Sequence, residues 1–338
     1  MNKKKNIDEN EIRPHNLVKK LQPFLRKDIK FLQSKLPLFK KVKCPACDSD
    51  YSKKYMVKEK FNYQICKNCD TFYLSPRAPL KVLNAFYKNS STYNFFNKYI
   101  YPKSEKARRS KIFLPRIKKI IALCKKYKIK KKPTILEIGA GIGSFCYLAK
   151  KSKFFSEIKA IEPSVENVKH ARKKGLDVFE GTVEKFRTKK KYDLIVNFEV
   201  LEHLHSPKFF LKLIKKYLKN NGIIFLTCPN GMGFDIQRLK EKSDSVDHEH
   251  LNYFNPKSIK ILFEKNGYTI INVSTPGQLD ANIVKNKIVQ KKYKIKKNDF
   301  FKKIYNDDEL VANFQEFLVQ NGLSSNMLVV AKLNQNNV

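Results

Sequence analysis

The chain has 338 residues, with 70 Lys and Arg against 31 Asp and Glu, and therefore a formal net charge of +39. Its 42% hydrophobic and 12% aromatic residues exclude a mainly disordered chain and are enough for one large or two smaller domains. No run of eighteen uncharged apolar residues occurs and no apolar segment follows the basic start, so we expect a cytoplasmic protein without a transmembrane helix or secretory signal. The charge favours anionic partners, but lysine is spread through every segment and predicts no single nucleic-acid-binding face.

Residues 1–43 form a basic extension with a helical pattern. Apolar residues recur at helical spacing, at Leu17, Leu21, Leu25, Ile29, Leu32 and Leu36. Pro23 and Pro37 are expected to interrupt this helix. The stripe can make weak contact with an anionic membrane surface or a partner, or it can pack on the protein's own core, and we favour the second interpretation.

A short cysteine module follows, at residues 44–79. Two pairs of cysteines, Cys44 with Cys47 and Cys66 with Cys69, are separated by 18 residues. This spacing is typical of a zinc ribbon, in which four thiolates form a closed tetrahedral site, so we predict a structural Zn²⁺. A disulfide framework is the alternative, which a cytoplasmic location disfavours. The remaining cysteines stand in apolar contexts and are expected to be buried thiols: Cys124, Cys146 and Cys228.

A helical connection at residues 80–132 leads to a segment, residues 133–275, in which strands and helices alternate. This alternation predicts a parallel sheet covered by helices on both faces. Strands are expected at residues 134–138, 158–162, 176–179, 192–198 and 222–228, and helices at 144–151, 164–174 and 207–219. A helix near 256–266 and a strand at 268–273 follow, and residues 276–338 read as a charged helical lobe with a final strand at 327–333.

A glycine-rich loop joins the first strand of this segment to its first helix. The sequence Glu137-Ile-Gly139-Ala140-Gly141-Ile-Gly143 lets the backbone turn sharply and approach a ligand, and the helix that follows offers free N–H groups. Glu162 ends the second strand, 19 residues after Gly143, where a carboxylate can accept hydrogen bonds from ribose hydroxyls. Together these features predict a nucleoside site.

These motifs resemble the class I S-adenosylmethionine-dependent methyltransferases over residues 133–275. The resemblance implies a Rossmann-like, doubly wound, seven-stranded α/β sheet with its last strand antiparallel. It also implies that the glycine loop and Glu162 bind S-adenosylmethionine, with the adenine near Gly181, Thr182 and Val183 and the methionine end near Asn197 and Phe198. A Rossmann-like domain for another nucleotide is the alternative.

Over about residues 44–333 the chain is similar to a narrower group that includes C-methyltransferases of nucleotide-linked keto-sugars. The residues that carry this resemblance are the cysteine module, Asp247-His248-Glu249-His250 with Tyr253 and Phe254, and residues 275–280. The resemblance implies a nucleotide-sugar acceptor in surface-polysaccharide or related biosynthesis. The basic extension lies outside it.

Methyl transfer needs a group that removes a proton from the acceptor. His250 is our candidate for this base, with Glu249 or Asp247 orienting it, because it matches the histidine of the sugar C-methyltransferases. Those enzymes carry Tyr where this chain has Asp247, which weakens the case for methylation of carbon. A structural histidine is an equal alternative, and Asp247, His248 and His250 could also bind a metal. His203 is a secondary candidate base.

Three functional hypotheses follow. We favour a methyltransferase acting on a small molecule, above all a nucleotide-activated sugar. The alternatives are an RNA methyltransferase that uses the zinc ribbon as a substrate module, and a non-catalytic scaffold that binds the cofactor.

Overall fold

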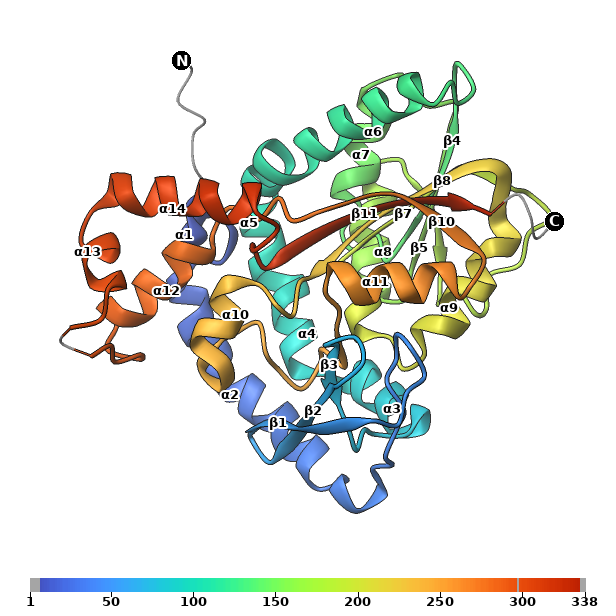
Figure 1. Ribbon diagram of the computed structural model, residues 1–338. Helices are drawn as coiled ribbons and strands as arrows, with labels where there is room; N and C mark the ends of the chain where they lie inside the picture. Colours follow the sequence, from blue (N-terminus) through green and yellow to red (C-terminus); the bar gives the residue numbers. More distant parts are fainter. Residues whose placement is uncertain (1–6, 297, 335–338) are drawn as a thin grey trace.

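The computed structural model describes residues 7–296 and 298–334, which form a large seven-stranded sheet and a small four-stranded sheet (Figure 1). The large sheet has the order β10-β11-β8-β7-β4-β5-β6. Its strands are β4 (Thr134–Ile138), β5 (Glu157–Glu162), β6 (Asp177–Glu180), β7 (Tyr192–Phe198), β8 (Leu218–Pro229), β10 (Tyr268–Ser274) and β11 (Asn326–Leu333). Only β11 runs antiparallel to its neighbours β8 and β10, as the resemblance implied.

Alternate residues of the central strands enter two different cores. In β7, Leu194 and Val196 pack on one face of the sheet and Ile195 on the other, as the two-residue period of a strand requires. The first face is covered by α6 (Leu114–Lys126), α7 (Ser144–Lys151) and α8 (Val165–Lys173), and the second by α9 (Pro207–Ile214) and α11 (Pro256–Glu264). The predicted doubly wound sheet is therefore confirmed.

One boundary differs from the prediction. The helix expected at 207–219 ends at Ile214, and β8 begins at Leu218, four residues before the expected start at residue 222. Leu218 pairs with Tyr192 at the start of β7. The amphipathic pattern alone assigns Leu218 to the helix, but in the structure its backbone pairs within the sheet.

The small sheet joins distant parts of the chain. Its order is β1-β2-β3-β9, with β1 (Ser52–Lys58), β2 (Phe61–Cys66), β3 (Phe72–Leu74) and β9 (Asn252–Tyr253). The first three strands belong to the expected cysteine module, whereas β9 follows β8 of the large sheet. Phe72 and Tyr253 are register partners whose rings stack with centroids 4.0 Å apart. The cysteine module therefore shares a sheet with the segment that begins at Asp247.

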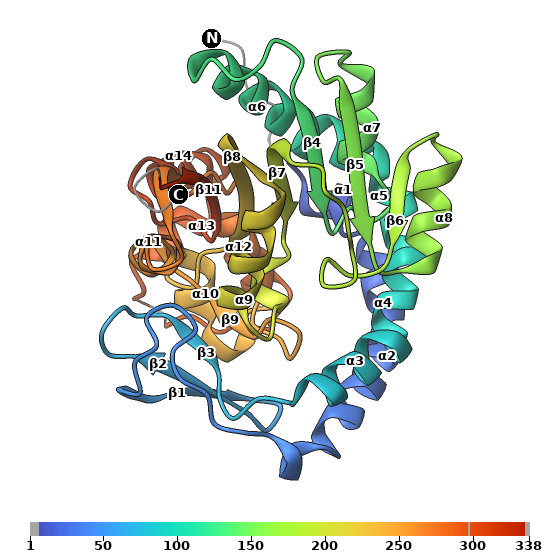
Figure 2. The same cartoon turned by 90° about the vertical axis from the view of Figure 1, so that its right-hand side faces the viewer.

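The amino-terminal helices pack on the protein itself. Helix α1 (Glu9–Ile12) is followed by α2 (His15–Gln33), which lies beside α3 (Leu80–Asn89) and α4 (Ser91–Phe95) (Figure 2). Leu21, Ile29 and Leu32 are buried, which confirms the favoured interpretation of the apolar stripe. The prediction that Pro23 interrupts the helix was wrong: Pro23 lies inside α2 on its exposed side, where solvent can satisfy the carbonyl that loses its donor.

From α4 the chain continues through two π-helical turns into the methyltransferase-like segment. Turn η2 (Phe96–Ile100) leads to α5 (Tyr101–Arg108), and η3 (Arg109–Phe113) leads to α6. Asp28 of α2 accepts hydrogen bonds from the Ser90 hydroxyl (2.7 Å) and the Thr92 N–H (2.8 Å), which fixes the start of α4.

A helical lobe is inserted between the last two strands. It contains α12 (Asp280–Val289), α13 (Phe301–Tyr305) and α14 (Asp308–Gln320), packed with α10 (Phe234–Leu239) around Leu239, Ala281, Val284, Tyr305 and Val311. Asn326, the first residue of β11, pairs with Pro229 at the end of β8, so the lobe rejoins the sheet at the carboxyl edge of the parallel strands. The predicted helical lobe is confirmed.

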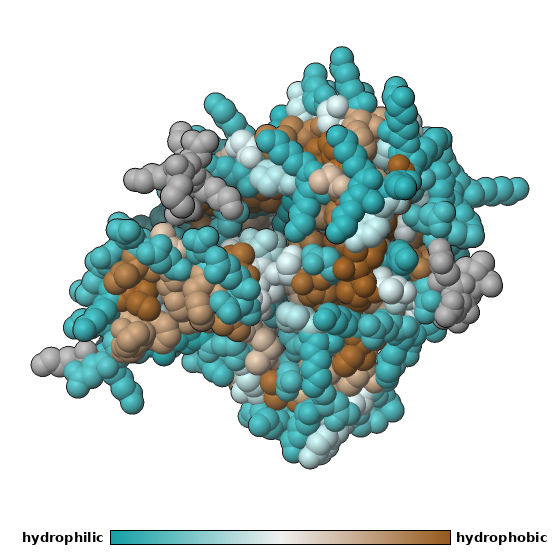
Figure 3. Space-filling model, turned by 45° about the horizontal axis from the view of Figure 1, so that its top comes forward, coloured by the Kyte–Doolittle hydropathy of each residue, from teal (hydrophilic) through white to brown (hydrophobic). Residues whose placement is uncertain are grey.

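Hydrophilic side chains cover much of the face shown in Figure 3, with hydrophobic surface both on the lobe at the left and over the middle of the molecule. Among the described residues, no helix combines the length and apolar character needed to cross a bilayer. All three isolated cysteines are buried as expected: Cys124, Cys146 and Cys228.

Candidate functional site

The glycine loop leaves one side of its backbone open. Gly139, Gly141 and Gly143 all have positive φ angles, of 78°, 54° and 77°. A Cβ on Gly139 would lie 2.6 Å from Val200, and one on Gly143 would lie 2.5 Å from Leu176, so both positions are tightly packed. A Cβ on Gly141 would meet nothing within 4 Å. The backbone at Gly141 therefore borders open space. Ala140, which lies between Gly139 and Gly141, donates its N–H to the carbonyl of Ile161.

Glu162 is held in place at the end of β5, beside this loop. Its carboxylate accepts hydrogen bonds from the N–H of Gly141 (2.7 Å), the N–H of Ser164 (3.0 Å) and the side chain of Asn167 (3.2 Å). Burial raises the pKa of Glu162, and these donors act against that rise. Two carboxylate oxygens have about four lone-pair sites, so Glu162 retains acceptor capacity for a ribose hydroxyl.

The turn after β6 is hydrogen-bonded to the end of β5, the strand that carries Glu162. The N–H of Gly181 donates to the carbonyl of Glu162 (3.0 Å), so the predicted adenine turn and the predicted ribose residue are adjacent. Thr182 is exposed at this turn, whereas the Val183 side chain is buried in the core.

Asn197 at the end of β7 is an unsatisfied buried amide. It is fully buried, and neither its amide nitrogen nor its amide oxygen has a partner among the described residues. Buried amides without partners are costly, so Asn197 is suited to a polar ligand at this edge of the sheet. Phe198 differs: its ring packs on Phe145 (centroids 4.9 Å apart) under the Arg116 guanidinium, in the core covered by α6, α7 and α8.

Glu137 is bonded inward rather than toward the open side of the loop. Its carboxylate accepts a hydrogen bond from the Cys146 thiol of α7 (2.8 Å). Burial raises the pKa of Glu137 to about 8. The side chain therefore ties the loop to α7.

The four cysteines of the amino-terminal module converge as their spacing predicts. Cys44 and Cys69, Cys47 and Cys66, and Cys47 and Cys69 have Sγ–Sγ distances of 3.5 Å each. Tetrahedral zinc with Zn–S bonds of about 2.3 Å requires Sγ atoms about 3.8 Å apart, so a small expansion would admit the ion. The thiol donor set fits a structural zinc ion.

The Asp247–His250 segment forms a tight turn that orients His250. One oxygen of Asp247 accepts the N–H groups of Glu249 and His250, both at 2.9 Å, and the other lies 3.3 Å from Nδ1 of His250. Tyr63 of β2 donates its hydroxyl to the Asp247 carbonyl (2.6 Å), so the small sheet supports the turn.

The side chains of Glu249 and His248 contact each other and nearby rings instead of the His250 ring. Glu249 is beside His248, with Oε1 and Nε2 3.8 Å apart. Burial raises the pKa of Glu249 well above its usual range, and a hydrogen bond with Tyr93 acts against that rise. His248 packs between the rings of Phe61 and Phe86 and has no hydrogen-bond partner among the described residues. His248 belongs to none of the possible metal-ligand groups in the described chain, so the predicted metal alternative with Asp247, His248 and His250 is not formed.

The structure brings His203, the secondary candidate base, close to His250 together with Glu202, which the sequence did not single out. The His203 and His250 rings have centroids 4.6 Å apart, and Glu202 precedes His203 in the turn η4 (Leu201–His203) directly after β7. The signal for Glu202 in the sequence is its place directly before His203, after the fourth strand. Tyr93, the hydrogen-bond partner of Glu249, comes from the helical connection, and no motif in the sequence marks it as part of this site.

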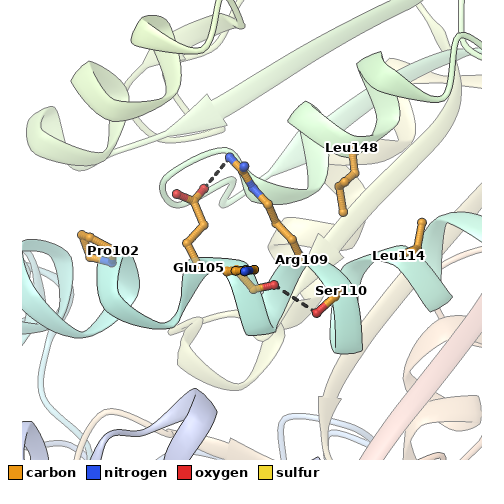
Figure 4. A pocket seen from close by; sticks show the side chains of 7 residues that line it. Pro102, Glu105, Arg109, Ser110, Leu114 and Leu148 are labelled. Carbon is orange, nitrogen blue, oxygen red and sulfur yellow. Dashed lines mark hydrogen bonds and ion pairs between the residues drawn. The ribbon is translucent and has the colours of Figure 1, made fainter. Parts of the chain in front are cut away.

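A surface pocket of about 440 Å³ lies away from these groups. It is lined by Pro102, Glu105, Lys106, Arg109, Ser110, Leu114 and Leu148 (Figure 4). Glu105 binds Arg109 (2.7 Å) and accepts a hydrogen bond from Ser144 (2.9 Å), the first residue of α7. This network holds the start of the helix that follows the glycine loop, while the pocket itself is bounded by α5, η3, α6 and α7 rather than by the ends of the strands.

Comparison with known proteins agrees with this arrangement. Residues 108–273 match the sequence family described as "Methyltransferase domain". A ubiquinone biosynthesis O-methyltransferase from Pelagibacter ubique is 34% identical over 106 residues, which cover 28% of this chain and 42% of that protein. One from Bartonella quintana is 27% identical over 153 residues, 40% of this chain and 60% of that protein. The chain thus matches less than two thirds of the length of either relative.

Solved structures with a similar fold include an S-adenosylmethionine-dependent methyltransferase from Clostridium acetobutylicum. It has a TM-score of 0.46 and 12% identity, and the match covers 71% of this chain and 99% of that one. The family match, together with the strand order and the glycine loop, identifies residues 108–273 as a class I S-adenosylmethionine-dependent methyltransferase domain.

Proposed function

We propose that this protein transfers a methyl group from S-adenosylmethionine to a small-molecule acceptor. The observation that carries the proposal is that two groups of residues share the carboxyl edge of the sheet. The open glycine loop with Glu162 follows β4 and β5, and the cluster around His250 adjoins the turn after β7, since Leu251 donates its N–H to the Glu202 carbonyl (2.8 Å). Ligands of doubly wound sheets bind at this edge.

We infer that the glycine loop and the ends of β5, β6 and β7 form the cofactor side of the site. We assign the ribose to Glu162, the adenine to the turn at Gly181, Thr182 and Val183, and the polar methionine end to Asn197 and the N–H groups of the glycine loop. When bound, S-adenosylmethionine supplies an electrophilic methyl group. The fit rests on the open side of Gly141 and on the unpartnered amide of Asn197.

On the acceptor side, His250 is our candidate proton acceptor. Its Nδ1 lies 2.9 Å from the Ser245 carbonyl, which can only accept, so the proton is on Nδ1 and Nε2 has a free lone pair. Asp247 fixes the ring, and the backbone carbonyl of Glu249, not its side chain, contacts His203 of the same cluster. A base positioned in this way needs only an acceptor hydroxyl, or a C–H beside a carbonyl, within hydrogen-bonding reach.

For the acceptor we propose a nucleotide-activated sugar, which also implies a cytoplasmic enzyme of carbohydrate biosynthesis. The support is the combination of the cysteine module, the Asp247–His250 turn and the helical lobe. The module pairs with β9, which directly follows the turn, and the lobe rejoins the large sheet through β11. A phenolic acceptor is the second candidate, because the curated relatives are named for O-methylation in ubiquinone biosynthesis.

The test is transfer of labelled methyl from S-adenosylmethionine to three separate pools: nucleotide-linked keto- and deoxy-sugars, dihydroxybenzoate derivatives, and unmodified RNA. We expect label in the sugar pool, lost in His250→Gln and retained in His205→Gln, a nearby histidine outside the cluster. Label in the phenolic pool alone would replace the sugar by the second candidate. Label in RNA alone would refute a small-molecule acceptor, and cofactor binding without label in any pool would favour a scaffold.

A further inference from the structure

Glu202 is a buried carboxylate without a hydrogen bond among the described residues. Its side chain is fully buried, and neither carboxylate oxygen has a hydrogen-bond partner among the described residues. Burial and the nearby Glu199 raise its pKa well above the usual range. A buried carboxylate with no donor is costly unless a proton or a cation accompanies it.

Two histidines present free lone pairs to the same space. Nδ1 of His203 lies 3.1 Å from the Glu249 carbonyl, and Nδ1 of His250 lies 2.9 Å from the Ser245 carbonyl. Because a carbonyl only accepts, each ring carries its proton on Nδ1 and leaves Nε2 unprotonated. Histidines that bind metals in proteins are commonly anchored in this way, with the second ring nitrogen donating to a backbone carbonyl.

The three side chains are close enough to share one ion. One ligand atom from each of Glu202, His203 and His250 lies within 4.8 Å of the others, and Nε2 of His203 is 4.0 Å from Oε1 of Glu202. Bonds of about 2.0–2.2 Å would bring these atoms to about 3–3.5 Å apart. Since the Glu202 carboxylate has no partner to lose, it can rotate toward an ion without breaking a hydrogen bond.

We propose that Glu202, His203 and His250 bind a first-row divalent transition-metal cation, separate from the cysteine site. Two imidazoles and one carboxylate favour Mn²⁺, Fe²⁺, Co²⁺ or Zn²⁺ over Mg²⁺ or Ca²⁺, which prefer oxygen ligands alone. Three protein ligands leave coordination positions open, and we assign them to an oxygen of the acceptor. This inference rests on the proposed function. It makes His250 a ligand of the cation instead of a free proton acceptor. A chelator distinguishes the two roles, because only the first requires a bound cation.

The experiment is a titration of the zinc-loaded protein with Mn²⁺, followed by electron paramagnetic resonance. Mn²⁺ is chosen because thiolates select softer ions, so the cysteine site does not compete for it. We expect one Mn²⁺ bound per chain, and at least tenfold weaker binding in Glu202→Gln and His203→Gln. His205→Gln is the matched control, with binding unchanged, and far-UV circular dichroism checks that each variant is folded.

The outcomes separate this inference from the proposed function. Absence of Mn²⁺ binding, or equal binding in Glu202→Gln, overturns the metal site. Methyl transfer that survives a chelator which removes Mn²⁺ leaves the enzyme function intact and refutes a catalytic cation. Mn²⁺ binding without methyl transfer to any acceptor pool supports the site and contradicts the function.

Discussion

Arg77 is a buried cation that joins the small sheet to the segments carrying His203 and His250. Its guanidinium is 2% exposed and donates to the carbonyls of Leu74 (3.1 Å), His205 (3.2 Å) and Leu251 (3.2 Å), and to the side chain of Asn252 (3.1 Å). Burial lowers its pKa to about 10, so the side chain remains charged at neutral pH. Replacing it by Met keeps most of the volume and leaves three of these acceptors without a donor, because the Leu251 carbonyl still accepts the Leu74 N–H (3.0 Å).

At about 1 kcal/mol for each unsatisfied acceptor, Arg77→Met should lower the free energy of unfolding by about 3 kcal/mol. The chain contains no Trp, so urea unfolding would be followed by far-UV circular dichroism. The slope of the unfolding free energy against urea should not change, because the extent of the folded structure is the same.

The matched control is Arg187→Met. Arg187 also donates to backbone carbonyls, those of Glu184 and Phe186, but it is exposed to solvent. We expect a change within about 0.5 kcal/mol, because water replaces the lost donor. A loss below about 1 kcal/mol in Arg77→Met, with the slope unchanged, would contradict the argument that these acceptors depend on one guanidinium.

Three further predictions test the cofactor site, the cysteine site and the lobe. Glu162→Ala should weaken S-adenosylmethionine binding by roughly 1–3 kcal/mol in calorimetry, through lost hydrogen bonds to the ribose and to the Gly141 N–H; unchanged affinity would remove Glu162 from the site. Cys66→Ser should abolish zinc in metal analysis while cofactor binding stays measurable, and wild-type protein free of metal would disprove the zinc assignment. Burial and the nearby Asp280 raise the pKa of Asp235 to about 7, so the unfolded state binds fewer protons than the folded state between pH 4 and 7, and stability should fall as pH rises. Asp235→Asn should therefore gain about 3 kcal/mol relative to wild type between pH 4.5 and 7.5 in urea unfolding, and a difference independent of pH would contradict the raised pKa.

Features that depend on neighbouring residues could be predicted from the sequence. The apolar runs at residues 134–138 and 192–198 match β4 and β7, and the cysteine spacing brings four thiols together. Both kinds of pattern reflect short-range geometry: the buried faces of a central strand, and the turn that places two thiols on one side.

Contacts between distant segments could not be predicted in this way. The pairing of β3 with β9 and the approach of Glu202 and His203 to His250 join residues more than 40 positions apart. No local period encodes such contacts, since they depend on how the loops after β7 and β8 meet at the sheet edge. The buried Asp28, which fixes the start of α4, was missed for the same reason.

The position of β9 in the small sheet also bears on how the chain is made. On the ribosome, β3 is complete at Leu74, whereas its partner β9 begins only at Asn252. At about 5–20 residues per second, the cysteine-bearing strands wait about 10–35 s with an unpaired edge. During this interval the exposed edge at Phe72 is open to pairing with another nascent chain, and early metal capture by the four thiols would be the main restraint on it.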